Sequence, residues 1–420
     1  MEIKPVKAFD RRLKCKPDKS VTHRAVMFNA AFGERAEIRN PLISADCLST
    51  IDCMRRLGAQ IEVGESVRIV KGGITAKSAT LDAGNSGTTM RLLSGLLAPF
   101  EGRFTLVGDE SLSLRPMNRV IAPLSLMGAK ISGRGGCAPL SITGGKLHGI
   151  DYDMPVNSAQ VKSAILLAGL KASGKTTVRE KIVSRDHTER MLAAMGAKIS
   201  ADGNSVTVGG GNKLHSVDVD VCGDISSAAY PFAFAAGLDG GKVTVENVGI
   251  NPTRTGILEV LKAMGAAVKI ENVRGSAEQT ADITVCGKVT RAVTVGGELI
   301  PRLIDELPVI AVLMALCGGE SVIKDAAELK VKETDRIETT VNALRALGVE
   351  AEGTADGMII YGRGYIPGGG VVDSCGDHRI AMSMSIAMAL SLRGGTLLGG
   401  EACAVSWPDF FTGLFGDKNV

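Results

Sequence analysis

Six apolar runs recur along the chain, and each of them follows a short polar segment. The runs are Ala25–Phe32, Met90–Ala98, Ala164–Leu170, Ala228–Leu238, Val309–Cys317 and Ile380–Leu390. Because they lack a polar stripe, they predict helices that are buried on all sides. The polar segments before them are Lys19-Ser20, Asn85-Ser86, Asn157-Ser158, Asp224-Ile225-Ser226, Asp305-Glu306 and Asp377-His378-Arg379. Such starts are typical of N-caps. If the N-termini converge, their N–H groups and partial positive charges also favour an anion site.

A second series of helices ends at glycines that recur with a regular spacing. The phrases are Leu57-Gly58-Ala59, Met127-Gly128-Ala129, Met195-Gly196-Ala197, Met264-Gly265-Ala266 and Leu347-Gly348-Val349, with a weaker sixth example at Phe415-Gly416. Successive glycines lie 70, 68, 69, 83 and 68 residues apart. Each follows an amphipathic run, so each predicts a helix that ends with a left-handed glycine. A period near 70 residues is longer than solenoid repeats, which indicates six small α/β modules.

Short β-branched runs between the helices predict the strands of these modules. Examples are Ser205–Val208, Lys242–Val245, Ala292–Val295 and Gly357–Tyr361. Each module then consists of a strand, a buried helix, a strand, an amphipathic helix and one or more further strands. Because 420 residues are too many for one core, we expect two domains with three modules each.

Composition excludes several classes of protein. The chain is 45% hydrophobic and 22% charged, as ordinary globular proteins are, and it has no run long enough to span a membrane. A net charge of +3 and only 4% aromatic residues argue against a nucleic-acid partner. Nine scattered cysteines and an N-terminus without the features of a signal or transit peptide favour a cytoplasmic location. The five histidines show no ligand spacing, so we expect no metal site.

One motif matches a known phosphate loop only in its letters. Residues 169–176 read Gly-Leu-Lys-Ala-Ser-Gly-Lys-Thr, which fits the pattern of nucleotide-binding P-loops. A P-loop follows a strand and opens a helix, whereas this segment follows the helix that ends near Leu170 and precedes a strand-like run, Thr176–Glu180. We therefore interpret it as a helix-to-strand turn.

Two polar segments carry residues suited to anion chemistry. Residues 330–336 read Lys-Val-Lys-Glu-Thr-Asp-Arg and pack five charges into seven positions. On its own this pattern also fits a solvated helix start with pairs Lys332–Asp335 or Glu333–Arg336. Residues 84–91, Gly-Asn-Ser-Gly-Thr-Thr-Met-Arg, combine glycines that permit close backbone approach with hydroxyls and a helix start.

Six ordered motifs make the chain resemble the 5-enolpyruvylshikimate-3-phosphate synthase family. They span residues 17–24, 84–88, 114–116, 158–163, 332–336 and 377–379, and read PDKSVTHR, GNSGT, LRP, SAQVKS, KETDR and DHR. The resemblance covers about residues 13–411. Asp18-Lys19-Ser20, Ser158-Ala159-Gln160 and Arg185–Glu189 are most similar to the branch called class II.

The resemblance implies a two-domain, inside-out α/β barrel built from six βαβαββ-type repeats, with the active site in the cleft between the domains. Residues 1–17 with 223–420 would form one domain, which includes the N-terminal strand, and residues 18–222 the other. The implied reaction transfers the enolpyruvyl group of phosphoenolpyruvate to the 5-hydroxyl of shikimate 3-phosphate and releases phosphate. The resemblance implies no cofactor, and we expect a monomer because one chain contains a whole site.

The resemblance also implies a role for each site residue. Phosphoenolpyruvate would be bound by Lys19, Asn85, Gly87, Arg115, Gln160, Arg336 and Arg379. Shikimate 3-phosphate would be bound by Lys19, Ser20, Arg24, Ser158, Ala159, Gln160, Arg185, Asp305 and Lys332. Lys19 would also assist catalysis, Asp305 would accept the 5-hydroxyl proton, and Glu333 would protonate the methylene carbon and later remove a proton. Arginine forks suit carboxylate and phosphate recognition.

The sequence departs from the family's usual pattern in a few places, and other readings stay open. Lys330 stands where many relatives have arginine, and Val405 where the enteric branch has a lysine near the substrate phosphate.

One alternative is the related UDP-N-acetylglucosamine enolpyruvyl transferase, but residues 110–114 lack its loop cysteine, and Cys137 follows the Gly128 helix end. A nucleic-acid end-processing protein of the same repeat fold is a second alternative. In this family glyphosate competes with phosphoenolpyruvate, and Gly87 predicts sensitivity to it.

Overall fold

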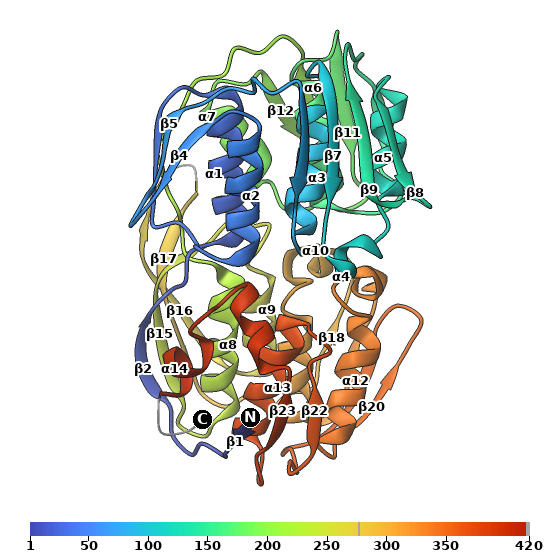
Figure 1. Ribbon diagram of the computed structural model, residues 1–420. Coiled ribbons are helices and arrows are strands. Elements are labelled where there is room, and N and C mark those ends of the chain that lie inside the picture. The colour runs from blue at the N-terminus through green and yellow to red at the C-terminus, as the bar shows by residue number, and fades with distance from the viewer. Residues whose placement is uncertain (276–277, 417–420) are drawn as a thin grey trace. The chain divides into compact units, whose positions relative to one another are not determined.

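The computed structural model describes residues 1–275 and 278–416 of the chain (Figure 1). The chain divides into two compact units: unit 1 comprises Met1–Lys16 and Cys222–Val420, and unit 2 comprises Pro17–Val221. The domain division expected from the sequence differs from these bounds only at Pro17 and Cys222. The chain enters unit 1 at Cys222 because the next residue, Gly223, already pairs with strand β15 (Lys242–Gly249) through its N–H and the Asn247 carbonyl, at 2.9 Å.

Unit 2 contains three repeats, each with one buried helix and one helix on the outside. The buried helices are α1 (Lys19–Phe32), α3 (Gly87–Leu97) and α6 (Ala159–Gly169), and the outer ones are α2 (Ala45–Arg56), α5 (Asn118–Leu126) and α7 (His187–Ala194). A short helix, α4 (Glu110–Ser113), precedes α5. The strands are β3 (Ala36–Arg39), β4 (Gln60–Val63), β5 (Val67–Lys71), β6 (Ser78–Asp82), β7 (Gly102–Val107), β8 (Lys130–Arg134), β9 (Cys137–Gly144), β10 (Asp151–Asp153), β11 (Lys175–Arg179), β12 (Ile199–Asp202), β13 (Ser205–Gly209) and β14 (Val219–Asp220).

Unit 1 repeats the same plan. Its buried helices are α8 (Ile225–Gly237), α11 (Leu307–Ala315) and α13 (His378–Leu390), and its outer helices are α9 (Gly256–Met264), α12 (Arg336–Ala346) and α14 (Phe410–Phe415). Shorter helices are η1 (Gly297–Leu299), α10 (Ile300–Leu303), η2 (Ala327–Val331) and η3 (Gly400–Val405). Besides β15, its strands are β1 (Glu2–Ile3), β2 (Asp10–Lys14), β16 (Ala267–Arg274), β17 (Thr280–Cys286), β18 (Thr294–Val295), β19 (Gly318–Ile323), β20 (Glu350–Gly353), β21 (Met358–Arg363), β22 (Val371–Asp373) and β23 (Gly395–Leu398).

The sheets of the described residues follow the six-module plan, and three of them are built from the strands of a single repeat. In the order β6-β7-β9-β8, the strands before and after the buried helix pair in parallel, and the last two strands add antiparallel. Sheets β10-β11-β13-β12 and β18-β19-β21-β20 follow the same rule. The parallel pair arises because a helix connects its two strands as a crossover. Each of these three repeats is thus a βαβαββ unit whose sheet covers its own buried helix.

The two repeats next to the unit boundary exchange their first strands. β2 lies before α1 in the sequence but pairs in parallel with β15 of unit 1, where Figure 1 shows it as a blue strand. Conversely, β14 lies before α8 but pairs in parallel with β3 of unit 2. The N-terminal strand β1 completes the last sheet, β1-β23-β22. The chain therefore crosses between the units twice, each time between a first strand and a buried helix.

Polar caps explain where the buried helices begin. The side chains of Asp18, Ser86, Asp224 and Asp377 each accept a backbone N–H from the first turn of α1, α3, α8 and α13. Capping by such residues stabilises a helix by about 1 kcal/mol. The six apolar runs are confirmed as buried helices with polar starts.

Left-handed glycines end the outer helices, as the period of the sequence predicts. The φ angles of Gly58, Gly128, Gly196, Gly265 and Gly348 lie between +82° and +112°, which only glycine adopts without strain. After each of the first four, the chain returns with the same hydrogen bond, from Thr75, His148, His215 and Thr290 N–H to the carbonyl before the glycine, at 2.9–3.0 Å. The weaker sixth example differs, because Gly416 has an extended ψ of 166°.

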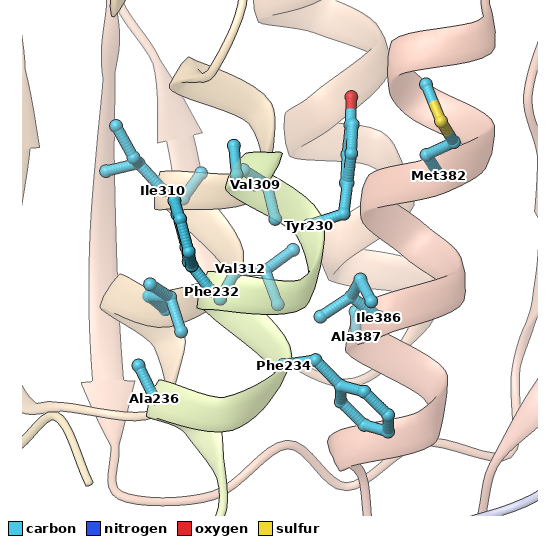
Figure 2. Packing of buried hydrophobic residues seen from close by; sticks show 14 of the residues in the cluster. Tyr230, Phe232, Phe234, Ala236, Val309, Ile310, Val312, Met382, Ile386 and Ala387 are labelled. Carbon is cyan, nitrogen blue, oxygen red and sulfur yellow. The ribbon is translucent and has the colours of Figure 1, made fainter. Parts of the chain in front are cut away.

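The core of unit 1 forms where its three buried helices meet. Figure 2 shows Tyr230, Phe232 and Phe234 of α8 beside Val309, Ile310 and Val312 of α11 and Met382 and Ile386 of α13. All of these side chains are buried. In unit 2 the corresponding helices approach so closely that a Cβ at Gly95 of α3 would overlap the Ala164 carbonyl of α6.

Two smaller expectations have different outcomes. The P-loop-like segment does join the end of α6, at Gly169, to strand β11, at Lys175, so its interpretation as a turn is confirmed. The strand expected at Ala292–Val295 is shorter, and only Thr294–Val295 pairs, with Val322 and Ile323. In the described part of the chain, no helix is long and apolar enough to cross a membrane.

Candidate active site

The start of α3 in unit 2 brings two arginines to one glycine. A Cβ built at Gly87 would lie 2.8 Å from Nη1 of Arg91 and 3.6 Å from Nη1 of Arg115. Arg91 follows Gly87 by one helical turn, so its side chain lies along the same face. Arg115 comes from the segment after α4 and is buried. The glycine therefore leaves room beside two guanidinium groups, where a larger residue would press on them.

The Asn85 amide holds Arg115 in place, and the Asp109 carboxylate in turn holds the amide. Its Nη2 donates to Oδ1 of Asn85 at 2.8 Å and to Oγ of Ser111 at 3.3 Å. The amide nitrogen of Asn85 donates to Oδ2 of Asp109 at 2.6 Å, and Oδ1 of Asp109 caps α4 by accepting the Leu112 N–H. Asp109 thus fixes which end of the Asn85 amide faces Arg115.

Gln160 joins this group from α6. Its Oε1 accepts a hydrogen bond from Arg91 Nη1 at 2.5 Å, and its Nε2 donates to Thr88 Oγ1 at 3.0 Å. The structure therefore brings Asn85, Gly87, Arg115 and Gln160 together. Arg91 links them but was not among the predicted site residues, although its position one helical turn after Gly87 could have indicated it.

A second cationic group forms around Arg24 of α1, which is buried. Its Nε donates to Thr188 Oγ1 at 2.7 Å, its Nη2 to Ser163 Oγ at 3.1 Å and its Nη1 to the Ser20 carbonyl at 3.0 Å. Ser163 and Thr188 also bond each other at 2.6 Å. These hydroxyl and carbonyl oxygens orient the guanidinium.

Lys19 and His23 complete the first turns of α1. Lys19 Nζ lies 3.1 Å from Oδ2 of Asp46, which comes from α2. The His23 ring bonds Thr50 Oγ1 through Nδ1 at 2.7 Å, and Thr50 bonds Thr89 of α3 at 2.6 Å. Burial, opposed by Asp46 and reinforced by Lys19, lowers the pKa of His23 from 6.5 to about 3. His23 is therefore a neutral link between the starts of α1 and α3.

Arg336 is the centre of the site residues in unit 1. It is 2% exposed, and its guanidinium contacts three carboxylates: Asp305 at 3.2 Å, Glu333 at 2.6 Å and Asp377 at 2.7 Å. Burial opposes the charge, but these carboxylates together raise the pKa of Arg336 above its ordinary value. Helix α12 begins at Arg336, capped by Asp335. The Glu333–Arg336 pair is thus present, but a solvated start is the wrong interpretation for Arg336.

Arg379 lies close to this group, on the first turn of α13. Its Nη1 donates to the Ser226 carbonyl and to the Tyr230 hydroxyl, each at 3.4 Å. Burial opposes its charge, but Tyr230, then Asp305 and further acidic groups raise the pKa of Arg379 well above its ordinary value. The arginine is therefore charged over the whole working pH range.

A buried network beneath Arg379 was not predicted from the sequence. Arg254 Nη2 donates to Ser226 Oγ at 2.6 Å and lies 3.3 Å from Oδ1 of Asp224. The Ser226 hydroxyl also bonds Oε1 of Glu306. Because Ser226 supplies the carbonyl that Arg379 contacts, the network fixes the position of that carbonyl.

The remaining predicted residues occupy turns and helix starts. Ser158 precedes α6 and Ala159 begins it, and the Ala159 carbonyl accepts the Ser163 hydroxyl at 2.7 Å. Arg185 lies in the segment between β11 and α7, and Lys332 directly follows η2. Among residues 1–275 and 278–416, no group of three or more His, Cys, Asp or Glu side chains could hold a metal ion.

Comparison with known proteins identifies the family. The family model described as EPSP synthase (3-phosphoshikimate 1-carboxyvinyltransferase) matches residues 3–414. The chain belongs to the EPSP synthase family. It is 50% identical over 404 residues to the 3-phosphoshikimate 1-carboxyvinyltransferase of Bacillus subtilis strain 168, with 94% of each chain covered. A relative from Geobacillus kaustophilus is 51% identical over 405 residues, covering 94% of this chain and 95% of its own.

Solved structures agree with this membership. An EPSP synthase from Acinetobacter baumannii superposes with a TM-score of 0.86 at 43% identity, covering 98% of this chain and 96% of its own. The enolpyruvyl transferase NikO from Streptomyces tendae shares the fold, with a TM-score of 0.79 at 17% identity and coverage of 99% and 96%. The fold class and the enzyme family expected from the sequence are confirmed.

Proposed function

We propose that the chain transfers the enolpyruvyl group of phosphoenolpyruvate to the 5-hydroxyl of shikimate 3-phosphate and releases phosphate. This reaction belongs to the route to aromatic amino acids. The observation that carries the proposal is the set of buried arginines, Arg24, Arg115, Arg336 and Arg379. Of these, Arg24 and Arg379 lie near the starts of the buried helices α1 and α13. Burying so many guanidinium groups is unfavourable unless anions or dipoles compensate them. Asp305, Glu333 and Asp377 compensate Arg336, and two substrates that both carry phosphate and carboxylate would bring further anions to the arginines.

The carboxylates around Arg336 fit the proton transfers. Asp305 would accept the proton of the 5-hydroxyl as its oxygen attacks the central carbon of phosphoenolpyruvate. Glu333 would protonate the methylene carbon, which gives a tetrahedral adduct, and would take a proton back from the methyl group as phosphate leaves. Arg336 contacts both carboxylates, so it positions the base and the acid relative to each other. Arg336, Arg379 and Arg115 would also bind phosphoenolpyruvate.

Shikimate 3-phosphate would bind to residues of α1, α6 and the segment before α7. Arg24 and Arg185 would bind its anionic groups, with Ser20, Ser158 and Ala159 around the ring. Lys19 and Gln160 would contact both substrates, and Lys332 would bind shikimate 3-phosphate beside Asp305. We further propose that the two units each contribute half of one site, as two domains of a monomer, and that the protein acts in the cytoplasm, where its nine free cysteines stay reduced.

Phosphate release tests the proposal. The purified protein should release phosphate from phosphoenolpyruvate only when shikimate 3-phosphate is present. UDP-N-acetylglucosamine replaces shikimate 3-phosphate in a parallel reaction to test the rival transferase. Release with the nucleotide sugar alone, or with neither acceptor, would refute the proposed acceptor.

A further inference from the structure

A fully buried lysine lies beneath the expected shikimate 3-phosphate residues. Lys162 is on α6, two residues after Gln160, and is 1% exposed. Its Nζ lies 2.7 Å from Oε2 of Glu180 and 2.7 Å from Oε1 of Glu189. Burial opposes its charge, but Glu189 and Glu180 raise the pKa of Lys162 above its ordinary value. A lysine is rarely buried this fully, so its contacts should serve a purpose beyond packing.

The first contact fixes the segment that carries Arg185. Lys162 Nζ donates to the Ser184 carbonyl at 3.3 Å. Glu180, held by the same lysine, accepts the Ser184 N–H at 3.2 Å and also its hydroxyl. Ser184 directly precedes Arg185 in the sequence. The lysine and Glu180 therefore hold the backbone from which the Arg185 side chain projects.

The second contact fixes the residue that orients Arg24. Glu189 lies on the first turn of α7, next to Thr188, whose hydroxyl accepts the hydrogen bond from Arg24 Nε. On the other side, Ser163 follows Lys162 on α6 and binds both Thr188 and Arg24. One buried ammonium group thus joins α6 to the two places that set the positions of both arginines.

We infer that Lys162, held by Glu180 and Glu189, is a positioning residue for the groups that bind shikimate 3-phosphate. It acts through Arg185 and Arg24 and does not itself touch substrate. This inference rests on the proposed function. The inference predicts that loss of Lys162 weakens binding of shikimate 3-phosphate and leaves binding of phosphoenolpyruvate unchanged. The reason is that the contacts described for Asn85 and Arg115 do not involve Lys162.

Lys162→Met tests the inference, since methionine keeps most of the length of the side chain and removes its charge. We expect KM for shikimate 3-phosphate to rise about 10- to 100-fold, the scale of a small displacement of binding groups. KM for phosphoenolpyruvate and kcat should stay within about twofold. Calorimetric titration with shikimate 3-phosphate alone should show the same loss of affinity.

A second variant avoids leaving two carboxylates unpaired in the interior. Ser184→Ala removes only the hydroxyl that binds Glu180, so it should fold and raise KM for shikimate 3-phosphate by about 2- to 10-fold. Val206→Ala, a buried residue on β13 in the same sheet as β11, controls for lost stability and should leave both KM values unchanged.

The possible results distinguish a failure of this inference from a failure of the proposed function. No release of phosphate by the unmodified protein would refute the proposed function. An active protein whose Lys162→Met and Ser184→Ala variants keep a normal KM for shikimate 3-phosphate would overturn the inference alone. Equal changes in both KM values, as from general loosening, would also overturn it. If Lys162→Met does not fold, Ser184→Ala decides.

Discussion

Gly87→Ala should weaken the binding of glyphosate more than the binding of phosphoenolpyruvate. Gly87 is the first residue of α3, and its φ lies outside the left-handed region. Alanine is therefore compatible with the backbone and should, if anything, favour the helix. The added methyl group would lie 2.8 Å from Arg91 Nη1, so the guanidinium must move by roughly 0.7 Å to reach an ordinary contact distance.

That movement has consequences because Arg91 is hydrogen-bonded. Its Nη1 donates to Gln160 at 2.5 Å, so the displacement reaches a residue expected to bind both substrates. The same methyl would lie 3.6 Å from Arg115, an ordinary contact that needs no shift. We expect KM for phosphoenolpyruvate to rise modestly. Glyphosate is longer than phosphoenolpyruvate and has less room to adjust, so its inhibition constant should rise about 10- to 200-fold more, the range for one methyl group in a pocket.

Steady-state kinetics with phosphate release would measure both constants in parallel. The matched control is Gly145→Ala in the same unit, where an added Cβ meets no atom within 4 Å and φ again lies outside the left-handed region. It should change neither constant. If Gly87→Ala raises both constants by the same factor, residue 87 does not set the discrimination and the reasoning from Arg91 fails.

Three further variants test other parts of the site. Asp305→Asn keeps an oxygen for Arg336 but cannot accept the 5-hydroxyl proton, so kcat should fall roughly 10²-fold with substrate affinity retained in titrations; near-normal kcat would rule out Asp305 as the base. Asp109→Asn would present an amide to the Asn85 amide and turn its oxygen away from Arg115, which should raise KM for phosphoenolpyruvate about tenfold and leave that for shikimate 3-phosphate unchanged; the opposite selectivity would contradict this. For His23, the folded-state pKa of about 3 lies below the ordinary 6.5, a difference worth roughly 5 kcal/mol. The contribution of neutral His23 to the free energy of unfolding should therefore be complete above pH 6.5 and decline as the pH falls toward 3. Urea unfolding between pH 7 and 4 should show a steeper loss for the unmodified protein than for His23→Gln, and parallel curves would exclude this role.

Much of the fold was predictable because it depends on local rules repeated six times. The helix-ending glycines need a positive φ that few other residues adopt, so Gly58 or Gly265 marks a helix end without any tertiary information. The all-apolar runs predict buried helices for a similar reason. The exchange of β2 and β14 between the units was not predictable from the hydrophobic pattern. Both strands are short, and the pattern of a strand does not indicate which strand it pairs with. Only the family resemblance placed the N-terminal strand.

The site was predictable only as far as its motifs extend. Asn85 and Arg115 lie 30 positions apart, yet the motifs indicated both. Their supporting residues escaped prediction, because Asp109, Lys162 and Arg254 act through partners distant in the sequence. Glu180 lies 18 positions from Lys162, and Asp224 lies 30 from Arg254. A charged residue directly before an apolar run, as Lys162 is before Ala164–Leu170, was the one visible signal, since on a buried helix it must find a buried partner.

The helix starts also change the first explanation of how anions are attracted. The sequence favoured a sum of free N–H groups and partial positive charges at six helix N-termini. Three of those starts are capped by carboxylates instead, Asp18, Asp224 and Asp377, each of which accepts an N–H of the first turn. A carboxylate there satisfies that N–H group and offsets the partial charge. The attraction at these starts must therefore come from side chains, and the helices serve mainly to aim them: Arg24 from α1 and Arg379 from α13. The starts of α3 and α6 differ, because their N-cap residues are the uncharged Ser86 and Ser158, and Ser158 makes no side-chain cap hydrogen bond. At these two starts the helix itself would contribute to anion binding.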